Sequence, residues 1–329
     1  MQAIFHEVLK QAIKENVSDI HFTLKKDFLH IQMRGTKGIT TLKKAYPAAL
    51  LNYLKYISNL DLGNEDKAQS GNFYHIYEGN QYFFRLSYIH THQVDTAVLR
   101  ILNNHASLSI QDLSKKRKQN VIFKQWCNIR SGLVILSGPT GSGKTTTLHA
   151  LLETIAKNKR LKVITLEDPI EIHSDSYLQL QINEAVHFGY EEGIAQLLRH
   201  DPDVIMIGEV RDSKSAKSLI RCALSGHMVF TTIHAKSCKE AILRLLDLGV
   251  NENDLKEVLT ALTNQRIFAS KNRKGRVCVY EIVQKDNIIK YFDTGGFDES
   301  HKDIFKEIME SVEQGYISKK EADADLYFY

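Results

Sequence analysis

The stretch GPTGSGKT, Gly138–Thr145, decides the fold of this chain. It matches the pattern G-x-x-x-x-G-K-[ST], and it lies between the apolar run Leu133–Leu136 and an amphipathic segment. Strand, glycine-rich loop and helix in that order form the context that a phosphate-binding loop requires. Glycines let successive N–H groups turn inward around anionic oxygens, and the dipole of the following helix adds to the attraction. The sequence therefore predicts a nucleoside triphosphate site.

Two side chains of this loop have specific expected roles. Lys144 is expected to reach the outer phosphates, and the hydroxyl of Thr145 is expected to hold Mg²⁺. ATP and Mg²⁺ are thus the predicted cofactors, and a glycine-rich turn that binds nothing is the alternative. The residues expected around the phosphates are Gly138, Pro139, Thr140, Gly141, Ser142, Gly143, Lys144, Thr145 and Thr146.

Carboxylates follow a second apolar run of strand length, Val163–Leu166. Ligands of open α/β sheets bind outside the carboxyl ends of the strands, so polar residues there are candidates for chemistry. We expect Glu167, Asp168 and Glu171 to face the nucleotide, Asp168 as a second ligand of Mg²⁺; a solvated strand end is the alternative.

A third run, Val204–Ile207, is followed by Gly208 and Glu209. In P-loop ATPases this position suits a carboxylate that orients and deprotonates the attacking water, so Glu209 is the predicted catalytic base. For Arg211 and Asp212 we expect a local ion pair or a helix cap.

Histidines flank a fourth run, Met228–Ile233. His234 comes after it, where we expect it to sense the γ-phosphate; a structural hydrogen bond is the alternative. Ser237 and Glu240 form the pattern of a capping box that opens the next helix.

The length and composition fit a soluble protein of two domains. A chain of 329 residues exceeds the size at which one core keeps growing. No apolar run approaches the roughly 20 residues of a membrane span, and the N-terminus does not resemble a signal peptide. We therefore expect a cytoplasmic protein. Four cysteines without a CxxC pair predict no zinc site. A net charge of +4 is mild and does not identify a partner, and we expect no direct binding of nucleic acid.

The pattern along the chain predicts an N-terminal α+β domain at 1–105, a linker at 106–120 and an α/β domain with a mainly parallel sheet at 121–329. The first domain reads as helix, two strands, helix and three strands, and Gly79–Asn80 is the expected turn of a hairpin. The run Lys115–Lys118 fits a solvated part of the linker, with contact to nucleic acid or anionic lipid as the alternative.

Five boxes in order resemble the type II/IV secretion ATPases, a family that includes GspE, PilB, PilT and the competence ATPase ComGA. They are GPTGSGKT, LEDPIE (Leu166–Glu171), HDPDVIMIGEVRD (His200–Asp212), GHMVFTTIHA (Gly226–Ala235) and NQR (Asn264–Arg266). The resemblance extends over the chain through SDIHF (Ser18–Phe22) and GRVCVYEI (Gly275–Ile282). The short form without a zinc module is most similar to the ComGA type.

This resemblance implies a RecA-like ATPase domain after a PAS-like N-terminal domain. It also implies a homo-hexamer in which Arg85 and Arg100 reach a nucleotide, and a histidine box in which His227 joins His234 at the site. The implied activity is that of an ATP-driven motor on the cytoplasmic face of the cell membrane, acting on a platform protein of the GspF, PilC or ComGB type. It would assemble a competence pseudopilus or a type IV pilus-like filament for DNA uptake. A retraction ATPase and a nucleotide-gated scaffold remain the alternatives.

Overall fold

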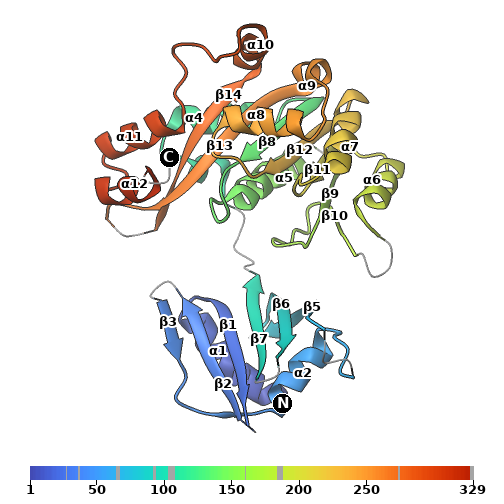
Figure 1. Ribbon diagram of the computed structural model, residues 1–329, viewed down its shortest axis with the longest axis vertical. Coiled ribbons are helices and arrows are strands. Elements are labelled where there is room, and N and C mark those ends of the chain that lie inside the picture. Colours follow the sequence, from blue (N-terminus) through green and yellow to red (C-terminus); the bar gives the residue numbers. More distant parts are fainter. Residues whose placement is uncertain are drawn as a thin grey trace. The chain divides into compact units, whose positions relative to one another are not determined.

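The computed structural model describes residues 1–26, 28–35, 38–63, 67–91, 94–102, 108–159, 161–183, 188–272 and 275–326. The chain divides into two compact units, Met1–His105 and Ala106–Tyr329 (Figure 1).

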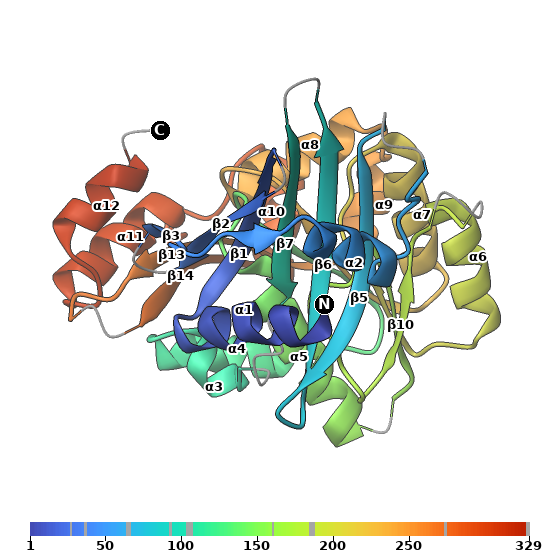
Figure 2. The same cartoon turned by 90° about the horizontal axis from the view of Figure 1, so that it is seen from below.

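The N-terminal unit is an antiparallel sheet with two helices on one face (Figure 2). Its strand order is β3-β2-β1-β7-β6-β5, and β4 also pairs with β2. The pattern of helices and strands is as predicted, with two short strands, β3 and β4, in addition. The elements are α1 (Gln2–Lys14), β1 (Val17–Lys25), β2 (Phe28–Gly35), β3 (Gly38–Thr41), β4 (Tyr46–Pro47), α2 (Ala49–Ile57), β5 (Gln69–Tyr77), β6 (Asn80–His90) and β7 (Asp95–Leu102).

The turn between β5 and β6 lies one residue earlier than predicted. Asn80 already pairs with Tyr77, so the two turn residues are Glu78 and Gly79, with φ of 49° and 78°. Positive φ at both positions is the geometry of a type I′ turn, whose twist matches that of the flanking strands. Glu78 is not a residue type that favours this conformation, which is why the sequence pointed to the pair Gly79–Asn80 instead.

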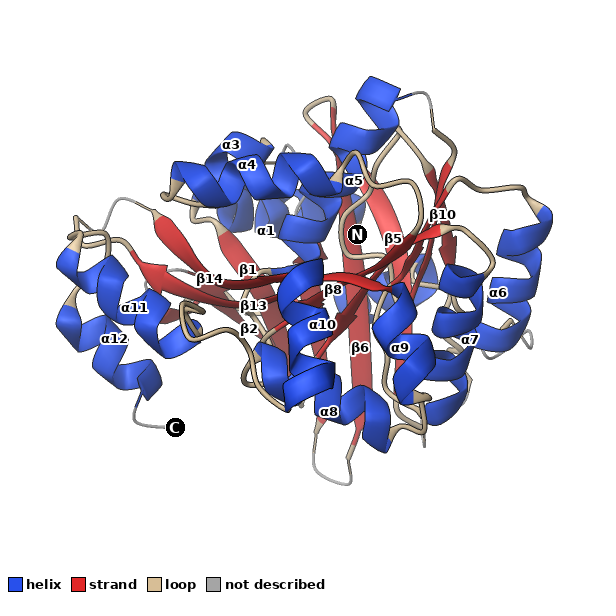
Figure 3. Cartoon of the chain, turned by 90° about the horizontal axis from the view of Figure 1, so that it is seen from above, coloured by secondary structure: helices blue, strands red, loops and turns tan. Residues whose placement is uncertain are grey.

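The C-terminal unit is the predicted α/β domain, with helices on both faces of a mainly parallel sheet (Figure 3). The strand order is β10-β9-β11-β12-β8-β13-β14, and only β14 runs antiparallel to its neighbour among the described strands. The strands are β8 (Gly132–Ser137), β9 (Val163–Glu167), β10 (Leu178–Gln181), β11 (Val204–Ile207), β12 (Met228–Ile233), β13 (Leu259–Ala269) and β14 (Arg276–Gln284). The helices are α3 (Ile110–Leu113), α4 (Arg117–Trp126), α5 (Lys144–Lys159), α6 (Tyr190–Arg199), α7 (Ser213–Leu224), α8 (Cys238–Asp247), α9 (Glu252–Val258), α10 (Lys285–Thr294), α11 (Ile304–Glu313) and α12 (Lys319–Leu326).

The sheet has a separate apolar core on each face because the side chains of a strand alternate between faces. Leu133 and Ile135 of β8 pack into the core under α6 to α10, whereas Val134 and Leu136 pack into the core under α3, α4 and α5. This central strand is buried along its whole length. The loop that follows it therefore starts from a fixed position.

The predicted linker at 106–120 is wrong for most of its length. Residues 106 and 107 lie outside the described part of the chain, but Ile110 and Leu113 form α3 and are buried in the core against α5. Linker-like composition was misleading here because a helix of four residues is too short to show apolar periodicity.

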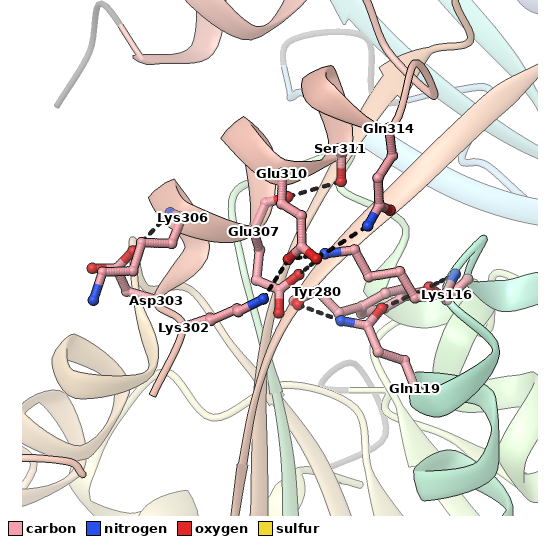
Figure 4. Close-up of polar contacts among 11 residues, drawn as sticks. Lys116, Gln119, Tyr280, Lys302, Asp303, Lys306, Glu307, Glu310, Ser311 and Gln314 are labelled. Carbon is pink, nitrogen blue, oxygen red and sulfur yellow. Dashed lines mark hydrogen bonds and ion pairs between the residues drawn. The ribbon is translucent and has the colours of Figure 1, made fainter. Parts of the chain in front are cut away.

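Lys116 is likewise not the solvated residue that we expected. Its amine contacts the carboxylate of Glu307 and lies 2.8 Å from an oxygen of Glu310, both on α11, and only 16% of its side chain is exposed (Figure 4). Lys302 lies 2.9 Å from the same oxygen of Glu310. Hydrogen bonds from both lysines lower the pKa of Glu310 to about 2, whereas burial raises the pKa of Glu307. We call Lys116, Lys302, Glu307 and Glu310 the α11 cluster; it fastens the segment before α4 to α11.

Candidate active site

The phosphate loop connects β8 to α5 and depends on a glycine at its first position. Gly138 has a φ of 147°, and a Cβ atom there would lie 2.6 Å from the carbonyl oxygen of Gln265 and 2.7 Å from the Ser142 hydroxyl. Gln265 also supports the loop directly, because its side-chain amide donates to the carbonyl of Ser142 at 2.7 Å. A side chain at position 138 would push the loop off this support.

Lys144 lies folded back on the loop. Its amine donates to the carbonyl oxygens of Gly138 at 2.9 Å and Pro139 at 3.0 Å. Burial lowers the pKa of Lys144 to about 8, and the negative charges of Glu209 and Glu171 only partly oppose that effect. The main-chain carbonyls are neutral partners, which the amine can leave for a phosphate oxygen. Thr145, half-buried, follows it in the first turn of α5, and Thr146 is exposed.

Glu209 lies at the carboxyl end of β11, and its backbone is fixed on both sides. The N–H of Gly208 donates to Leu166 in β9 at 2.8 Å, and its carbonyl accepts from the Thr232 hydroxyl at 2.7 Å. The N–H of Val210 donates to the carbonyl of Thr232 at 3.1 Å. Gly208 also permits a close approach, since a Cβ there would lie 3.3 Å from the carbonyl oxygen of Leu166.

Both oxygens of the Glu209 carboxylate are engaged. Oε2 accepts from Arg211 Nε at 2.9 Å and Nη2 at 2.7 Å, and Oε1 lies 3.1 Å from Nε2 of His234. Burial and then the charge of Lys144 lower the pKa of His234, which favours the neutral imidazole beside the Glu209 carboxylate. Lys144, Glu209, Arg211 and His234 together form what we call the strand-end cluster.

The three carboxylates at the end of β9 and just after it are not equivalent. Glu167 is buried, at 2% exposure, and its Oε1 accepts from Thr165 at 2.7 Å and from Gln179 at 3.0 Å. Asp168 is exposed and acts electrostatically on Tyr190 and Arg211. Glu171 is also exposed, and its charge acts on Lys144. Of the three, Glu171 is the carboxylate that is among the main influences on the pKa of Lys144.

His227 does not lie at the site, contrary to the expectation. It precedes β12, whose first residue pairs with Gly132 at the start of β8, whereas Ile233 pairs with Ser137 next to the phosphate loop. A strand rises about 3.3 Å per residue, which separates the two ends by about 20 Å. Its Nδ1 contacts the Ser225 hydroxyl at 3.0 Å and the carbonyl of Cys222 at 3.2 Å instead. His227 therefore has a structural role at the opposite end of the strands, where β8 and β12 begin.

Arg85 and Arg100 lie next to each other in the N-terminal sheet. They are paired across β6 and β7, so both project from one face, which is opposite to the face that carries Phe84, Leu86 and Leu99 into the core. Arg100 is exposed and donates from Nε to Asp19 at 2.8 Å; Arg85 is half-exposed. Their guanidinium groups are thus on the surface of this unit.

Several supporting residues were not predicted as parts of the site. Asn264 donates to the Ser137 hydroxyl at 2.8 Å and to the carbonyl of Ala235 at 3.0 Å, which ties the end of β8 to the segment after His234. Arg266, 2% exposed, donates to Asn264 at 2.6 Å and lies 3.2 Å from a carboxylate oxygen of Asp325 in α12. The NQR box was visible in the sequence, but its burial behind the loop was not.

Asp212 is an N-cap of α7, one of the two roles expected for it.

A phosphate loop after the central strand of a parallel sheet, with a glutamate and a histidine at the ends of neighbouring strands, defines a P-loop nucleoside triphosphatase with a RecA-like fold. The chain belongs to the family described as type II/IV secretion system protein, whose model matches residues 1–323. It is accordingly an ATPase.

Individual relatives agree with this family. The chain is 33% identical to competence protein ComGA of Bacillus subtilis over 81% of this chain and 76% of that protein. It is 35% identical to ComGA of Streptococcus pneumoniae, over 82% and 85%, and 31% identical to ComGA of Halalkalibacterium halodurans, over 96% of both.

Solved structures share the fold over nearly the whole chain. The pilus retraction motor PilT with bound ADP superposes with a TM-score of 0.78 at 24% identity, covering 97% of this chain and 96% of that one. The ATPase DotB of Legionella pneumophila superposes with a TM-score of 0.79 at 20% identity, covering 99% and 96%. Within the described residues, no helix is long and apolar enough to cross a membrane.

Proposed function

We propose that this ATPase is a hexameric motor that powers assembly of a competence pseudopilus or type IV pilus-like filament for DNA uptake. The similarity to three ComGA proteins over most of the chain supports the biological role. The observation that carries the chemistry is the Glu209 carboxylate, which lies between Arg211 and His234 and acts electrostatically on Lys144.

In this proposal Lys144 exchanges its two main-chain carbonyl partners for oxygens of the outer phosphates of ATP. His234 is neutral and holds Oε1 of Glu209. When a γ-phosphate is present, the Nε2 proton of His234 turns to a phosphate oxygen, and Oε1 of Glu209 becomes free to accept a proton from water. His234 thus senses the γ-phosphate by releasing the base.

The residues around the loop fit a Mg²⁺ ion, because hydroxyl and carboxylate oxygens are the ligands that Mg²⁺ prefers. Thr145 supplies the hydroxyl. The carboxylates whose charges act most on Lys144 in the loop are Glu209 and Glu171. Asp168 is a further candidate ligand, although its electrostatic partners are Tyr190 and Arg211. When bound, the ion neutralises charge on the phosphate oxygens.

Arg85 and Arg100 are proposed to stabilise the transition state at a nucleotide held by a neighbouring subunit. Their exposure on one sheet face supports contact with another surface. Loss of an arginine finger lowers turnover by about 10³–10⁵-fold.

Mixed rings test this trans arrangement. Arg85→Ala or Arg100→Ala protein is co-assembled with Glu209→Gln protein, so that some interfaces combine an intact arginine with an intact glutamate. We expect the mixture to hydrolyse ATP faster than either parent. A mixture that never exceeds its parents contradicts the assignment.

The direction of filament movement is tested in cells. The gene is deleted, the cells are sheared, and the sheared fraction is probed for the major pilin alongside transformation frequency. We expect pilin to stay in the membrane and transformation to stop, with rescue by wild type but not by Glu209→Gln. Abundant surface filament in the deletion strain would instead identify a retraction ATPase, and rescue by Glu209→Gln would identify a nucleotide-gated scaffold.

The partner is proposed to be the cytoplasmic part of a platform protein of the GspF, PilC or ComGB type, which places the motor on the cytoplasmic face of the membrane. Co-purification of the tagged ATPase with such a platform protein from membranes checks this, with a strain lacking the platform gene as the control.

A further inference from the structure

A buried histidine connects the phosphate-binding helix to the acidic turn after β9. His149 lies on α5, one helical turn after Thr145, and is 1% exposed. Its Nδ1 contacts the hydroxyl of Tyr177, and its Nε2 lies 3.5 Å from Oε2 of Glu167. A fully buried imidazole between a phenol and a carboxylate is costly unless its polar atoms are used.

The neighbours of His149 decide which nitrogen carries its proton. Burial and the charge of Glu167 raise the pKa of Tyr177, so the phenol keeps its proton and can donate it to Nδ1. A proton on Nε2 of His149 then faces the carboxylate of Glu167. The opposite tautomer would direct a lone pair at a negative charge.

Oε2 is the oxygen of Glu167 that His149 faces, because Thr165 and Gln179 both donate to Oε1. Among the described residues, Nε2 of His149 makes no hydrogen bond, since 3.5 Å to Oε2 is longer than a standard bond. A small movement of α5 toward β9 therefore completes the contact.

A second connection runs along the same helix. Glu153, one turn after His149, accepts from the Ser176 hydroxyl at 3.0 Å and contacts the Ser174 hydroxyl. Gln179 joins the same loop to Glu167 through the carbonyl of Ile172 at 2.9 Å. The segment that carries Asp168 and Glu171 is thus attached to α5 at two successive turns.

We propose that His149 is a positioning residue for hydrolysis, which orients the Glu167 carboxylate from Nε2 and holds the 168–177 loop to α5 through Tyr177. The acidic turn and the phosphate loop then respond to nucleotide as one unit. This proposal rests on the proposed function, in which the Glu167–Glu171 turn acts at the nucleotide.

Two substitutions separate the contact of His149 with Tyr177 from its contact with Glu167. The amide of Asn reaches about as far as Nδ1, and the amide of Gln reaches about as far as Nε2. His149→Asn therefore keeps the contact with Tyr177 and loses Glu167, whereas His149→Gln keeps Glu167. We expect His149→Asn to lower kcat by about 10–100-fold, the usual effect of losing an outer-shell partner, with KM for ATP within about threefold. His149→Gln should stay within about threefold in kcat.

A double-mutant cycle on the full-length oligomer tests whether the effect passes through Glu167. In a Glu167→Gln background, His149→Asn should lower kcat by less than twofold more. Two results would reduce His149 to a packing role. One is an equal loss of kcat from His149→Asn in both backgrounds. The other is an equal loss of kcat in His149→Asn and His149→Gln, accompanied by equal falls in Tm. Wild-type kcat in both variants would also overturn the proposal.

Two controls keep the outcomes separate. Inactive wild type would contradict the proposed function itself, whereas active wild type with inactive Glu209→Gln leaves that function standing whatever His149 does. If His149→Asn does not fold, Tyr177→Phe replaces it in the cycle. Unlike His149→Gln, which keeps a donor toward Glu167, Tyr177→Phe lets the proton of His149 move from Nε2 to Nδ1 and so weakens the contact with Glu167. Its expected loss of about 3–10-fold in kcat should again vanish in the Glu167→Gln background, and an additive loss contradicts the proposal.

Discussion

Two clusters in the ATPase domain combine lysines with glutamates and use them in opposite ways. In the α11 cluster, Lys116 is paired directly with Glu307 and Glu310. In the strand-end cluster, Lys144 donates to the neutral carbonyls of Gly138 and Pro139. A lysine that is neutralised by carboxylates holds two elements together. A buried lysine whose partners are neutral carbonyl oxygens has a charge that no direct partner neutralises, so it can bind an incoming anion. The partners of a lysine, more than its burial, distinguish a structural role from a functional one.

Within the two clusters, the largest effect is expected from the proposed base, Glu209. Glu209→Gln keeps the size of the side chain but cannot accept a proton, and it leaves one acceptor oxygen in place of two, so turnover should fall by about 10²–10⁴-fold while ATP remains bound. Phosphate release and retention of labelled ATP measure the two properties. Normal hydrolysis would transfer the role of base to Glu167, Asp168 or Glu171.

Lys144→Ala should lower turnover by about 10²–10³-fold, since it removes a charged donor aimed at the developing charge. The Tm of the nucleotide-free protein should not fall, because no carboxylate loses a direct partner. Circular dichroism gives the control. A lowered Tm with retained turnover would make the two clusters alike.

Lys116→Ala should show the reverse pattern. It leaves Glu307 and Glu310 without their shared partner, and we expect a loss of about 1–3 kcal/mol in the free energy of unfolding. This is below the value for fully buried pairs because water reaches part of the cluster. Chemical denaturation measures it, with turnover per folded molecule unchanged. Lys302→Ala, at 53% side-chain exposure, is the matched control with a smaller loss.

Nucleotide affinity should decrease as pH rises through the pKa of Lys144 near 8. Phosphate binds the protonated amine, so the free protein must take up a proton above this pH, and affinity should fall about tenfold between pH 7 and pH 9. Titration calorimetry in buffers of different ionisation enthalpy measures the proton uptake. In Lys144→Arg, whose guanidinium stays charged, the pH dependence should disappear.

The smallest effect is expected at His227, at the end of β12 that lies away from the phosphate loop. His227→Ala should leave turnover within about twofold, because β12 separates it from the phosphate loop by about 20 Å. His234→Ala, at the near end of the same strand, should lower turnover by about tenfold or more. Equal losses would mean that the two ends of the strand are coupled.

The sequence was sufficient where local pattern and strand direction carry the information. The phosphate loop and the carboxyl-end positions of Glu209 and His234 follow from apolar runs and the residues after them. His227 was misassigned because the box GHMVFTTIHA was treated as one unit, although a six-residue strand separates its histidines.

Tertiary contacts account for what the sequence did not predict. Nothing in the local sequence indicates that Glu167 is buried against His149. Nor does it indicate that Lys116 contacts Glu307, which lies on α11, 191 residues further along the chain. Arg211 does form a local ion pair, as expected, but the sequence did not indicate that its partner would be Glu209.

The contact between Arg266 and Asp325 has a consequence for genetics. A stop codon at or shortly before codon 325 would leave every residue of the strand-end cluster in place. It would nevertheless remove the counter-ion of a guanidinium that is 2% exposed and bonded to Asn264, which supports the end of β8. Such a nonsense allele would therefore behave as a lesion of the nucleotide site, and suppressors of it would be found around Arg266.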